Sequence, residues 1–256
     1  MLLIVFVFVL NPLGSFATNS HSVDLEKGSS QWLSRPENAE LSITGDMSAE
    51  IMVKVESVPG TSTQYGFIDK GQLSGGQASY SFYYQQNGAD VKSLRVAISS
   101  DGGTVNQSVD LVNFTLTTGT WFRIGFSYDA SAGEIIFYVN GVKEGATQTG
   151  AETSIFDSTT DLNVGAIHAG TDSFFDGLVD DVRVWDDIRT STEMADNDDC
   201  ELGSSQDNLV GYWKLDNDLT DSSVNSNTLT NNNSAVFSTD VNFTASCEQR
   251  RVIITQ

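Results

Sequence analysis

A short loop near the C-terminus groups oxygen-bearing side chains in a way that suits a hard cation. Between Asp221 and Asn227, an aspartate, serines and two asparagines, Asn225 and Asn227, fall within seven residues. Ca²⁺ takes roughly six to eight oxygen ligands of this kind, and Asp180 or Asp181 would complete the set from a neighbouring strand. The sequence therefore predicts a structural Ca²⁺ here, unless Asp221 and Asn225 only cap their own turn.

A second pair of residues suits a sugar. In the strand predicted at Tyr80–Gln85, alternation turns Tyr83 outward from the core, beside Arg95 on the strand predicted at Leu94–Ile98. An exposed aromatic ring next to a polar hydrogen-bonding group is an arrangement that stacks against sugar rings. Tyr83 and Arg95 are therefore the candidate ligand-binding residues. The alternative is that Tyr83 only covers the surface of the sheet.

The first residues have the composition of a secretory signal peptide. Met1–Leu10 is an apolar run too short to span a bilayer, and the small residues Ser15 and Ala17 follow it. We predict a signal peptide at residues 1–17, with cleavage before Thr18, and no membrane insertion of the mature domain. No Lys or Arg precedes Lys27, which is unusual for such a segment. A buried first strand is the alternative.

Export would carry the two cysteines, Cys200 and Cys247, into an oxidising compartment. A disulfide between them would contribute on the order of 4 kcal/mol by the loop-closure model. The sequence alone leaves open whether they pair or stay free.

The charge of the chain excludes one class of partner. Its 256 residues carry 34 acidic and 13 basic side chains, a net charge of −21. Nucleic-acid binding depends on Lys and Arg displacing counterions from phosphates, so we expect no such partner. Anionic lipid is excluded for the same reason. With 39% hydrophobic and 10% aromatic residues, the length fits one large β domain.

Short apolar alternations separated by polar turns predict many antiparallel strands. In one of them Ala49 and Ile51 share a buried face, and Glu50 and Met52 take the wet face. A hairpin is predicted where Asp129 to Gly133 would join two strands. Other strands are predicted at Leu162–Ala166, Leu178–Trp185 and Val210–Leu215, with one helical turn at Thr192–Ala195 capped by Thr190 or Ser191. The pattern predicts an all-β, two-sheet antiparallel β-sandwich of the jelly-roll type.

Three motifs carry a family resemblance. They are Thr120-Trp121-Phe122-Arg123-Ile124, Phe137-Tyr138-Val139-Asn140-Gly141, and the run from Phe175 through Asp180 and Asp181 to Trp185. Their order and spacing resemble the laminin-G-like jelly-roll family, which is related to pentraxins and to the concanavalin A-like lectins and glucanases. The segment Leu209–Asp216 is similar to a motif usually found at the start of that domain. The resemblance implies a domain over residues 18–245, with its last strands filling the place of the usual first ones, and a tail at 246–256.

The resemblance implies binding rather than catalysis, in a secreted or cell-surface recognition or adhesion module for glycan or protein ligands. A glucanase on this fold needs two carboxylates facing each other across a groove. The sequence has no Glu-x-Asp-x-x-Glu, and adjacent Asp180 and Asp181 point to opposite faces of a regular strand. We therefore predict no catalytic residues. A glycan-cleaving hydrolase and a purely structural extracellular domain remain the alternatives.

Overall fold

The structure is a computed structural model that describes residues 19–72, 75–87, 91–103, 107–203, 206–243 and Cys247. The predicted signal peptide at 1–17 lies outside the described residues, as does the predicted tail at 246–256 apart from Cys247.

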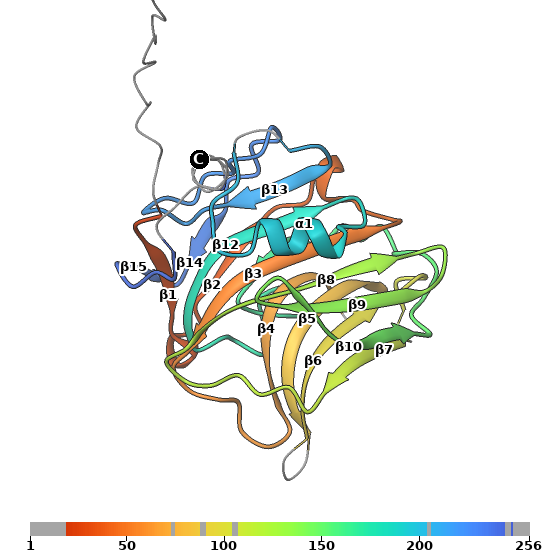
Figure 1. The fold of residues 1–256 in the computed structure, drawn as a ribbon, viewed down its shortest axis with the longest axis horizontal. Helices are drawn as coiled ribbons and strands as arrows, with labels where there is room; N and C mark the ends of the chain where they lie inside the picture. The colour runs from red at the N-terminus through yellow and green to blue at the C-terminus, as the bar shows by residue number, and fades with distance from the viewer. Residues whose placement is uncertain are drawn as a thin grey trace, which may run out of the picture.

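Two antiparallel sheets pack face to face, as the alternation predicts, and form a β-sandwich (Figure 1). We call them sheet A and sheet B. Sheet A runs in the order β10 (Val142–Thr149), β9 (Glu134–Val139), β8 (Trp121–Asp129), β3 (Met47–Val55), β12 (Gly177–Trp185), β1 (Ser22–Leu25) and β15 (Val236–Ser238), with β13 (Leu209–Trp213) also paired to β12. Sheet B runs in the order β14 (Thr230–Asn232), β2 (Trp32–Arg35), β11 (Leu162–Val164), β4 (Thr63–Gln72), β5 (Gln77–Asn87), β6 (Val91–Ile98) and β7 (Gln107–Val112).

The core lies between the two sheets. Phe82 of β5 is fully buried, and its ring lies 5.3 Å from the ring of Phe126 on β8, so that the two sheets meet through aromatic contact. Phe67 of β4 lies 5.4 Å from Phe82 on the same sheet. Burying such large apolar side chains is the main driving force of folding.

The last strands of the chain complete both sheets. β13 pairs with β12 and β15 pairs with β1 in sheet A, while β14 pairs with β2 in sheet B. Most of the Leu209–Asp216 motif forms β13, which therefore lies inside the same sandwich. Without these strands, β1 and β2 would each leave an unpaired edge.

A helical cover lies on the outer face of sheet A (Figure 1). The helix α1 (Ser191–Asp196) begins at Thr190, whose side chain accepts from the backbone of Glu193 in a capping box. The helix prediction is therefore confirmed, with Thr190 as the cap. Single 3₁₀ turns occur at η1 (Lys27–Ser29) and η2 (Ala39–Leu41). None of the helices in the described part of the chain is long and apolar enough to cross a membrane.

The cover corrects one prediction about β3. Glu50 and Met52 were expected on a wet face, but they are only 3% and 1% exposed. The segment that follows α1 packs over this face and takes it out of solvent, and a strand's own alternation cannot reveal a cover formed by residues far along the chain.

Candidate functional site

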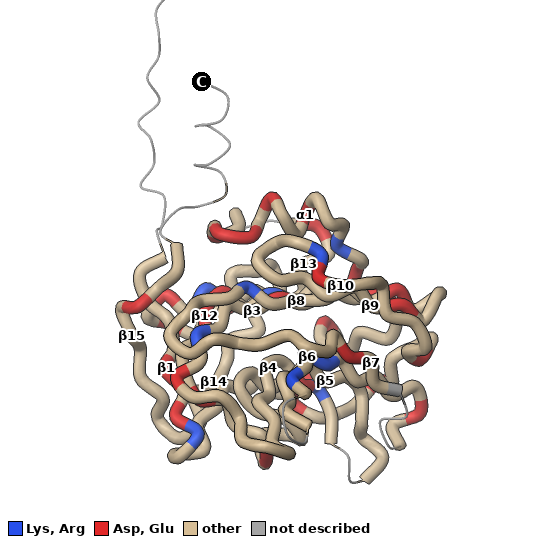
Figure 2. Tube along the Cα trace, turned by 60° about the horizontal axis from the view of Figure 1, so that its bottom comes forward, with Lys and Arg blue, Asp and Glu red and all other residues tan. Residues whose placement is uncertain are grey.

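A row of polar side chains crosses four strands on the outer face of sheet B. We call Gln64, Gln85, Arg95 and Asp110 the polar ladder. Gln64 Nε2 donates to Gln85 Oε1 at 3.2 Å, and Arg95 Nη1 donates to the same oxygen at 3.2 Å. Arg95 also forms a two-pronged ion pair with Asp110, with Nη2 2.5 Å from Oδ2 and Nε bonded to Oδ1. In Figure 2 basic positions on β6 lie close to acidic positions toward β7.

A cleft of about 210 Å³ opens beside this ladder. Its lining includes Gln64, Ser81, Tyr83, Arg95, Ile167 and His168. The structure thus brings together the two predicted ligand-binding residues, which are paired directly across β5 and β6. Hydroxyl, amide, guanidinium and aromatic groups meet in this one small hollow, which is the mixture that recognises polar, ring-shaped ligands.

Tyr83 lies on the predicted face, but it is not the exposed platform that the sequence predicts. It is 8% exposed, because Ile167 packs against it together with Ala97. Burial raises the pKa of the Tyr83 phenol, and neighbouring Arg95 opposes that shift. Tyr83 therefore contributes a protonated hydroxyl to the cleft, and only a small part of its side chain is exposed.

The loop at residues 165–174 forms one wall of the cleft. It sits directly on Gly66 of β4, where a Cβ atom would lie 2.6 Å from the carbonyl carbon of Ala166. The Gly66 amide donates to the carbonyl of Ser173 at 2.8 Å. On its other side, Gly170 has a φ of +70° and its backbone lies against the indole of Trp32. Any side chain at these two glycines would push the loop off the sheet.

Asp69 anchors this loop from below. It is fully buried on β4, Ser81 Oγ donates to its Oδ1, and the backbone amides of His168 and Ala169 interact with its carboxylate. Burial raises the pKa of Asp69 to about 7, and these hydrogen bonds oppose the rise. His168 is half-buried, and burial lowers the pKa of its imidazole. At neutral pH the cleft therefore presents a neutral imidazole.

Some of these residues carried a signal in the sequence. Ser81, Tyr83 and Gln85 alternate along one strand, so the face that carries Tyr83 had to carry the other two. Asp69 and His168 could not be found this way. They lie far apart in the chain, on β4 and in the 165–174 loop, and come together only in the folded structure.

The loop predicted to hold calcium uses its oxygens internally. Asp221 Oδ1 accepts from the backbone amides of Tyr212 and Ser223, and Oδ2 accepts from Ser223 Oγ and the amide of Asn227 at 2.7 Å. Asn225 and Asn227 each donate from Nδ2 to the carbonyl of Val210 at 3.0 Å. Asp221 thus caps its own turn, as in the alternative that the sequence left open, whereas the Asn225 side chain holds the loop against β13.

Asp180 and Asp181 are directed elsewhere. Asp180 accepts from Asn19 Nδ2 at 2.7 Å, and burial raises its pKa well above the ordinary range. Asp181 has a φ of +44° at an irregularity of β12, so the strand is not regular where the two acids were expected to alternate. The structure does not bring either carboxylate into the 221–227 loop through any contact among the described residues.

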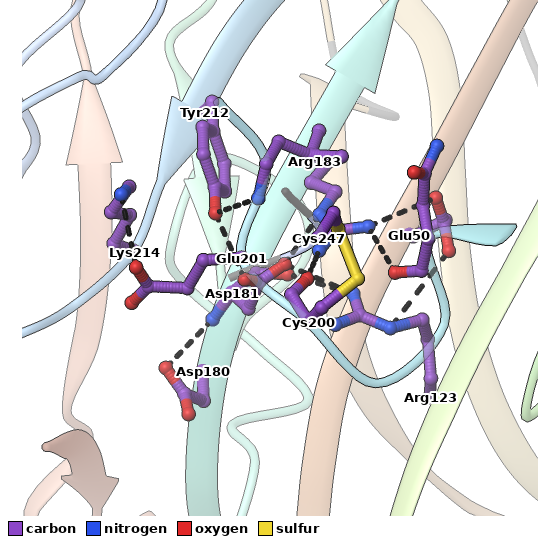
Figure 3. Close-up of polar contacts among 12 residues, drawn as sticks. Glu50, Arg123, Asp180, Asp181, Arg183, Cys200, Glu201, Tyr212, Lys214 and Cys247 are labelled. Atoms are coloured by element: carbon purple, nitrogen blue, oxygen red, sulfur yellow. Dashed lines mark hydrogen bonds and ion pairs between the residues drawn. A yellow bond between two sulfur atoms is a disulfide. The ribbon is translucent and has the colours of Figure 1, made fainter. Parts of the chain in front are cut away.

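Asp181 is the centre of a buried charge network instead (Figure 3). Arg183 bonds to Asp181 through Nε, and Arg123 Nη1 lies 3.1 Å from the same oxygen. Glu50 lies 3.8 Å from Arg183 and 4.0 Å from Arg123. Tyr212 Oη donates to Asp181 at 3.0 Å. Two positive and two negative groups thus compensate one another away from water.

The network also holds its own cover. Arg183 donates to the carbonyls of Asn197 at 2.8 Å and Cys200 at 2.5 Å. Cys200 is bonded to Cys247, so the disulfide is present in the structure (Figure 3). The segment at 196–199 is therefore part of a packed lid, and Asn197 is buried. Covered and ion-paired carboxylates of this kind hold structure together; they do not face a substrate groove.

A cluster of three acidic side chains could hold a metal ion. Asp24, Glu26 and Glu56 each offer one carboxylate oxygen, and the three oxygens lie within 4.8 Å of one another. Burial raises the pKa of Glu56, and repulsion from Asp24 and its neighbours adds to the rise. Burial likewise raises the pKa of Asp24, with Asp176 contributing. Such mutual repulsion would be relieved by a bound cation.

Two antiparallel sheets that pack face to face define the class of the protein as an all-β sandwich. Residues 27–195 match the family model for laminin G domains, described as the concanavalin A-like lectin/glucanases superfamily. The match spans more than half of the chain, and the chain belongs to this family. The family resemblance drawn from the sequence is confirmed. Comparison with curated proteins found no match.

Three solved structures are similar in fold. A Bacteroides ovatus protein provisionally assigned as carbohydrate-binding has 18% identity and a TM-score of 0.68; the similarity covers 90% of this chain and 62% of that protein. A heptameric SAP-like pentraxin from Limulus polyphemus has 9% identity and a TM-score of 0.59, covering 87% of this chain and 96% of that one. The CBM40 of the Ruminococcus gnavus IT-sialidase, bound to α2,3-sialyllactose, has 13% identity and a TM-score of 0.51, covering 68% and 94%. Identities this low show the fold alone.

The buried carboxyl beneath the loop predicts a pH dependence of stability. The pKa of Asp69 is about 7 in the folded chain and 3.8 in its ordinary state. The protonated carboxyl therefore contributes its full stabilisation below pH 3.8, and this stabilisation is lost as the pH rises toward 7. Asp69→Asn should remove about 2 kcal/mol of the fall in unfolding free energy between pH 5 and pH 8. Urea unfolding at several pH values measures this.

The matched control is Asp207→Asn, which removes an exposed carboxylate from a turn. Its profile should run parallel to that of the unsubstituted protein. Parallel profiles for Asp69→Asn as well would contradict the assignment of the pH dependence to Asp69.

Proposed function

We propose that this protein is a non-catalytic glycan-binding module and that its binding surface is the outer face of sheet B around Tyr83 and Arg95. The single observation that carries the proposal is the cleft beside the polar ladder. Tyr83, the amide of Gln64 and the guanidinium of Arg95 line the cleft, and the neighbouring ladder residues Gln85 and Asp110 hold the amide and the guanidinium in place. Fixed polar groups of this kind bind hydroxyl-rich ligands without a further ordering cost.

The charge pattern favours a neutral sugar. Both prongs of Arg95 are taken by Asp110, so the guanidinium offers no uncompensated charge to an acid on the ligand. The chain as a whole carries a net charge of −21, which repels anionic glycans. Family membership supports binding to sugars, since lectins share this fold, although glucanases share it too.

The proposal predicts that Arg95→Ala weakens glycan binding. Removing the guanidinium leaves Gln85 and Asp110 without their shared partner, so affinity should fall roughly tenfold or more, equal to about 1.4 kcal/mol. Tyr83→Phe, which removes only the hydroxyl at the cleft floor, should give a smaller loss. A glycan array identifies the ligand, and titration calorimetry measures each variant.

Lys143→Ala on exposed β10 of the other sheet is the control, because it removes the same charge from a residue that does not line the cleft. If no glycan binds, the proposal fails. If a glycan binds and Arg95→Ala retains full affinity, the assignment of the site fails. Release of reducing sugar from laminarin, agarose or xylan would favour the hydrolase instead.

We further propose that Ca²⁺ stabilises the fold. Of the two candidate places, the Asp24, Glu26 and Glu56 group is favoured, because an ion in the 221–227 loop would displace hydrogen bonds that Asp221 already accepts. A chelator should then lower the melting temperature by several degrees, and Glu56→Gln should abolish that effect.

Asp221→Asn separates the two places, since it would abolish the chelator effect only if the loop holds the ion. A melting temperature that does not change on chelation, measured by calorimetry, argues against calcium at either place.

We also propose export. The apolar run at 1–10 and the disulfide between Cys200 and Cys247 support it, because disulfides persist in oxidising compartments. The mature protein should begin at Thr18. Its mass should be lower than that of the reduced chain by the two hydrogens lost on disulfide formation. Intact mass spectrometry of protein recovered from the culture medium measures both, and an uncleaved chain retained in the cells would contradict export.

A further inference from the structure

A second and larger hollow, of about 410 Å³, lies at the other side of the 165–174 loop. Lys27, Ser62, Thr63, Gln64, Asp172 and Phe174 contribute to its lining. The half-buried ring of Phe174 packs against Trp32, with ring centroids 5.8 Å apart and planes tilted by 51°. This hollow therefore repeats the composition of the first, with one aromatic ring held among hydroxyl, amide and charged groups.

Gln64 belongs to both hollows. Its Nε2 donates to Gln85 Oε1 in the polar ladder, and its Oε1 accepts from Ser173 Oγ at 3.4 Å. One amide thus links the ladder to the loop that separates the two hollows. A ligand long enough to leave the first hollow past Gln64 would enter the second without crossing any other strand.

The loop between them is held in an unusual backbone conformation. His168, Ala169 and Ser173 all have positive φ values, at +55°, +59° and +54°. Left-handed backbone is strained at residues other than glycine and persists only where the surroundings fix it. Here Gly66, Asp69 and Trp32 fix it, and the result places His168 at one hollow and Phe174 at the other.

The size of the first hollow also points to a divided site. Pockets that enclose a drug-sized ligand occupy roughly 300–1,000 Å³, whereas the cleft over Tyr83 has about 210 Å³. It suits a single ring of a larger molecule, and the rest of that molecule needs another surface.

We propose that the two hollows are consecutive subsites for one neutral glycan chain, with one sugar unit over Tyr83 and Arg95 and a later unit against Phe174. This inference rests on the proposed function and deepens it, because it distinguishes a binder of chains from a binder of single terminal sugars. Like Arg95 in the first subsite, Lys27 in the second does not offer an uncompensated positive charge to an anionic ligand. Its ammonium lies 5.1 Å from the centroid of the Tyr65 ring, and the carboxylate of Asp172 lines the same hollow.

Chain length tests the inference. Neutral oligosaccharides of one to six units, prepared from laminarin, agarose and xylan, are titrated by calorimetry. In the series that binds, affinity should rise at least tenfold once the chain spans both subsites and then level off. Phe174→Ala should reduce the affinity for the longest oligosaccharide to about that of the shortest.

A blocking variant guards against a folding defect at Phe174. Thr63→Trp fills the second hollow from an exposed strand position, and it should remove the same length dependence. Val142→Trp adds the same side chain to an exposed position on β10 and serves as the control. Melting curves confirm that each variant is folded.

The outcomes separate the two proposals. If a sugar binds with an affinity that Arg95→Ala weakens but chain length does not change, the second subsite is wrong and the proposed function stands. If affinity rises with length but neither Phe174→Ala nor Thr63→Trp affects it, the additional units bind elsewhere and this inference is wrong. If no oligosaccharide binds, both proposals fail.

Discussion

Each sheet of a sandwich has an outer face that the other sheet does not cover. How the polar groups on that outer face are paired or solvated determines the arrangement of the remaining segments of this protein. The inner faces of sheets A and B bury the apolar side chains between them. The outer faces have no such partner, and each must either be covered or carry groups that water can solvate. The two sheets meet this constraint differently: the outer face of sheet A is covered around a buried charge network, and the outer face of sheet B keeps a row of partly exposed polar groups.

Sheet A is covered, and the cover brings charges into the interior. Arg123, Arg183, Asp181 and Glu50 neutralise one another, and Arg183 also donates to two carbonyls of the covering segment. Such a network costs desolvation, and losing one member would strand its partner. The network and the Cys200–Cys247 bond therefore make the lid, the strands and the C-terminal region one unit.

The alternation of apolar and polar residues predicted the strands, but segments far away in the chain determine which side chains of those strands are buried. Alternation identified β3, the β8–β9 hairpin and the outward direction of Tyr83. It could not foresee that a lid would bury Glu50, or that Ile167 would close over Tyr83, because those contacts join residues far apart in the chain. Composition had a similar limit at Asp221, where oxygens that suit a cation accept backbone amides instead.

Sheet B is only partly covered, by the 165–174 loop, and the polar groups beside that loop are already paired with one another. Gln64, Gln85, Arg95 and Asp110 keep fixed directions because each holds the next, yet their partly exposed members retain unused donors and acceptors. An anion would have to compete with Asp110 for Arg95 against the field of a strongly acidic protein. A hydroxyl can donate to the carboxylate and accept from the guanidinium without breaking the pair. This pairing supports the proposal that the ligand is neutral and rich in hydroxyl groups.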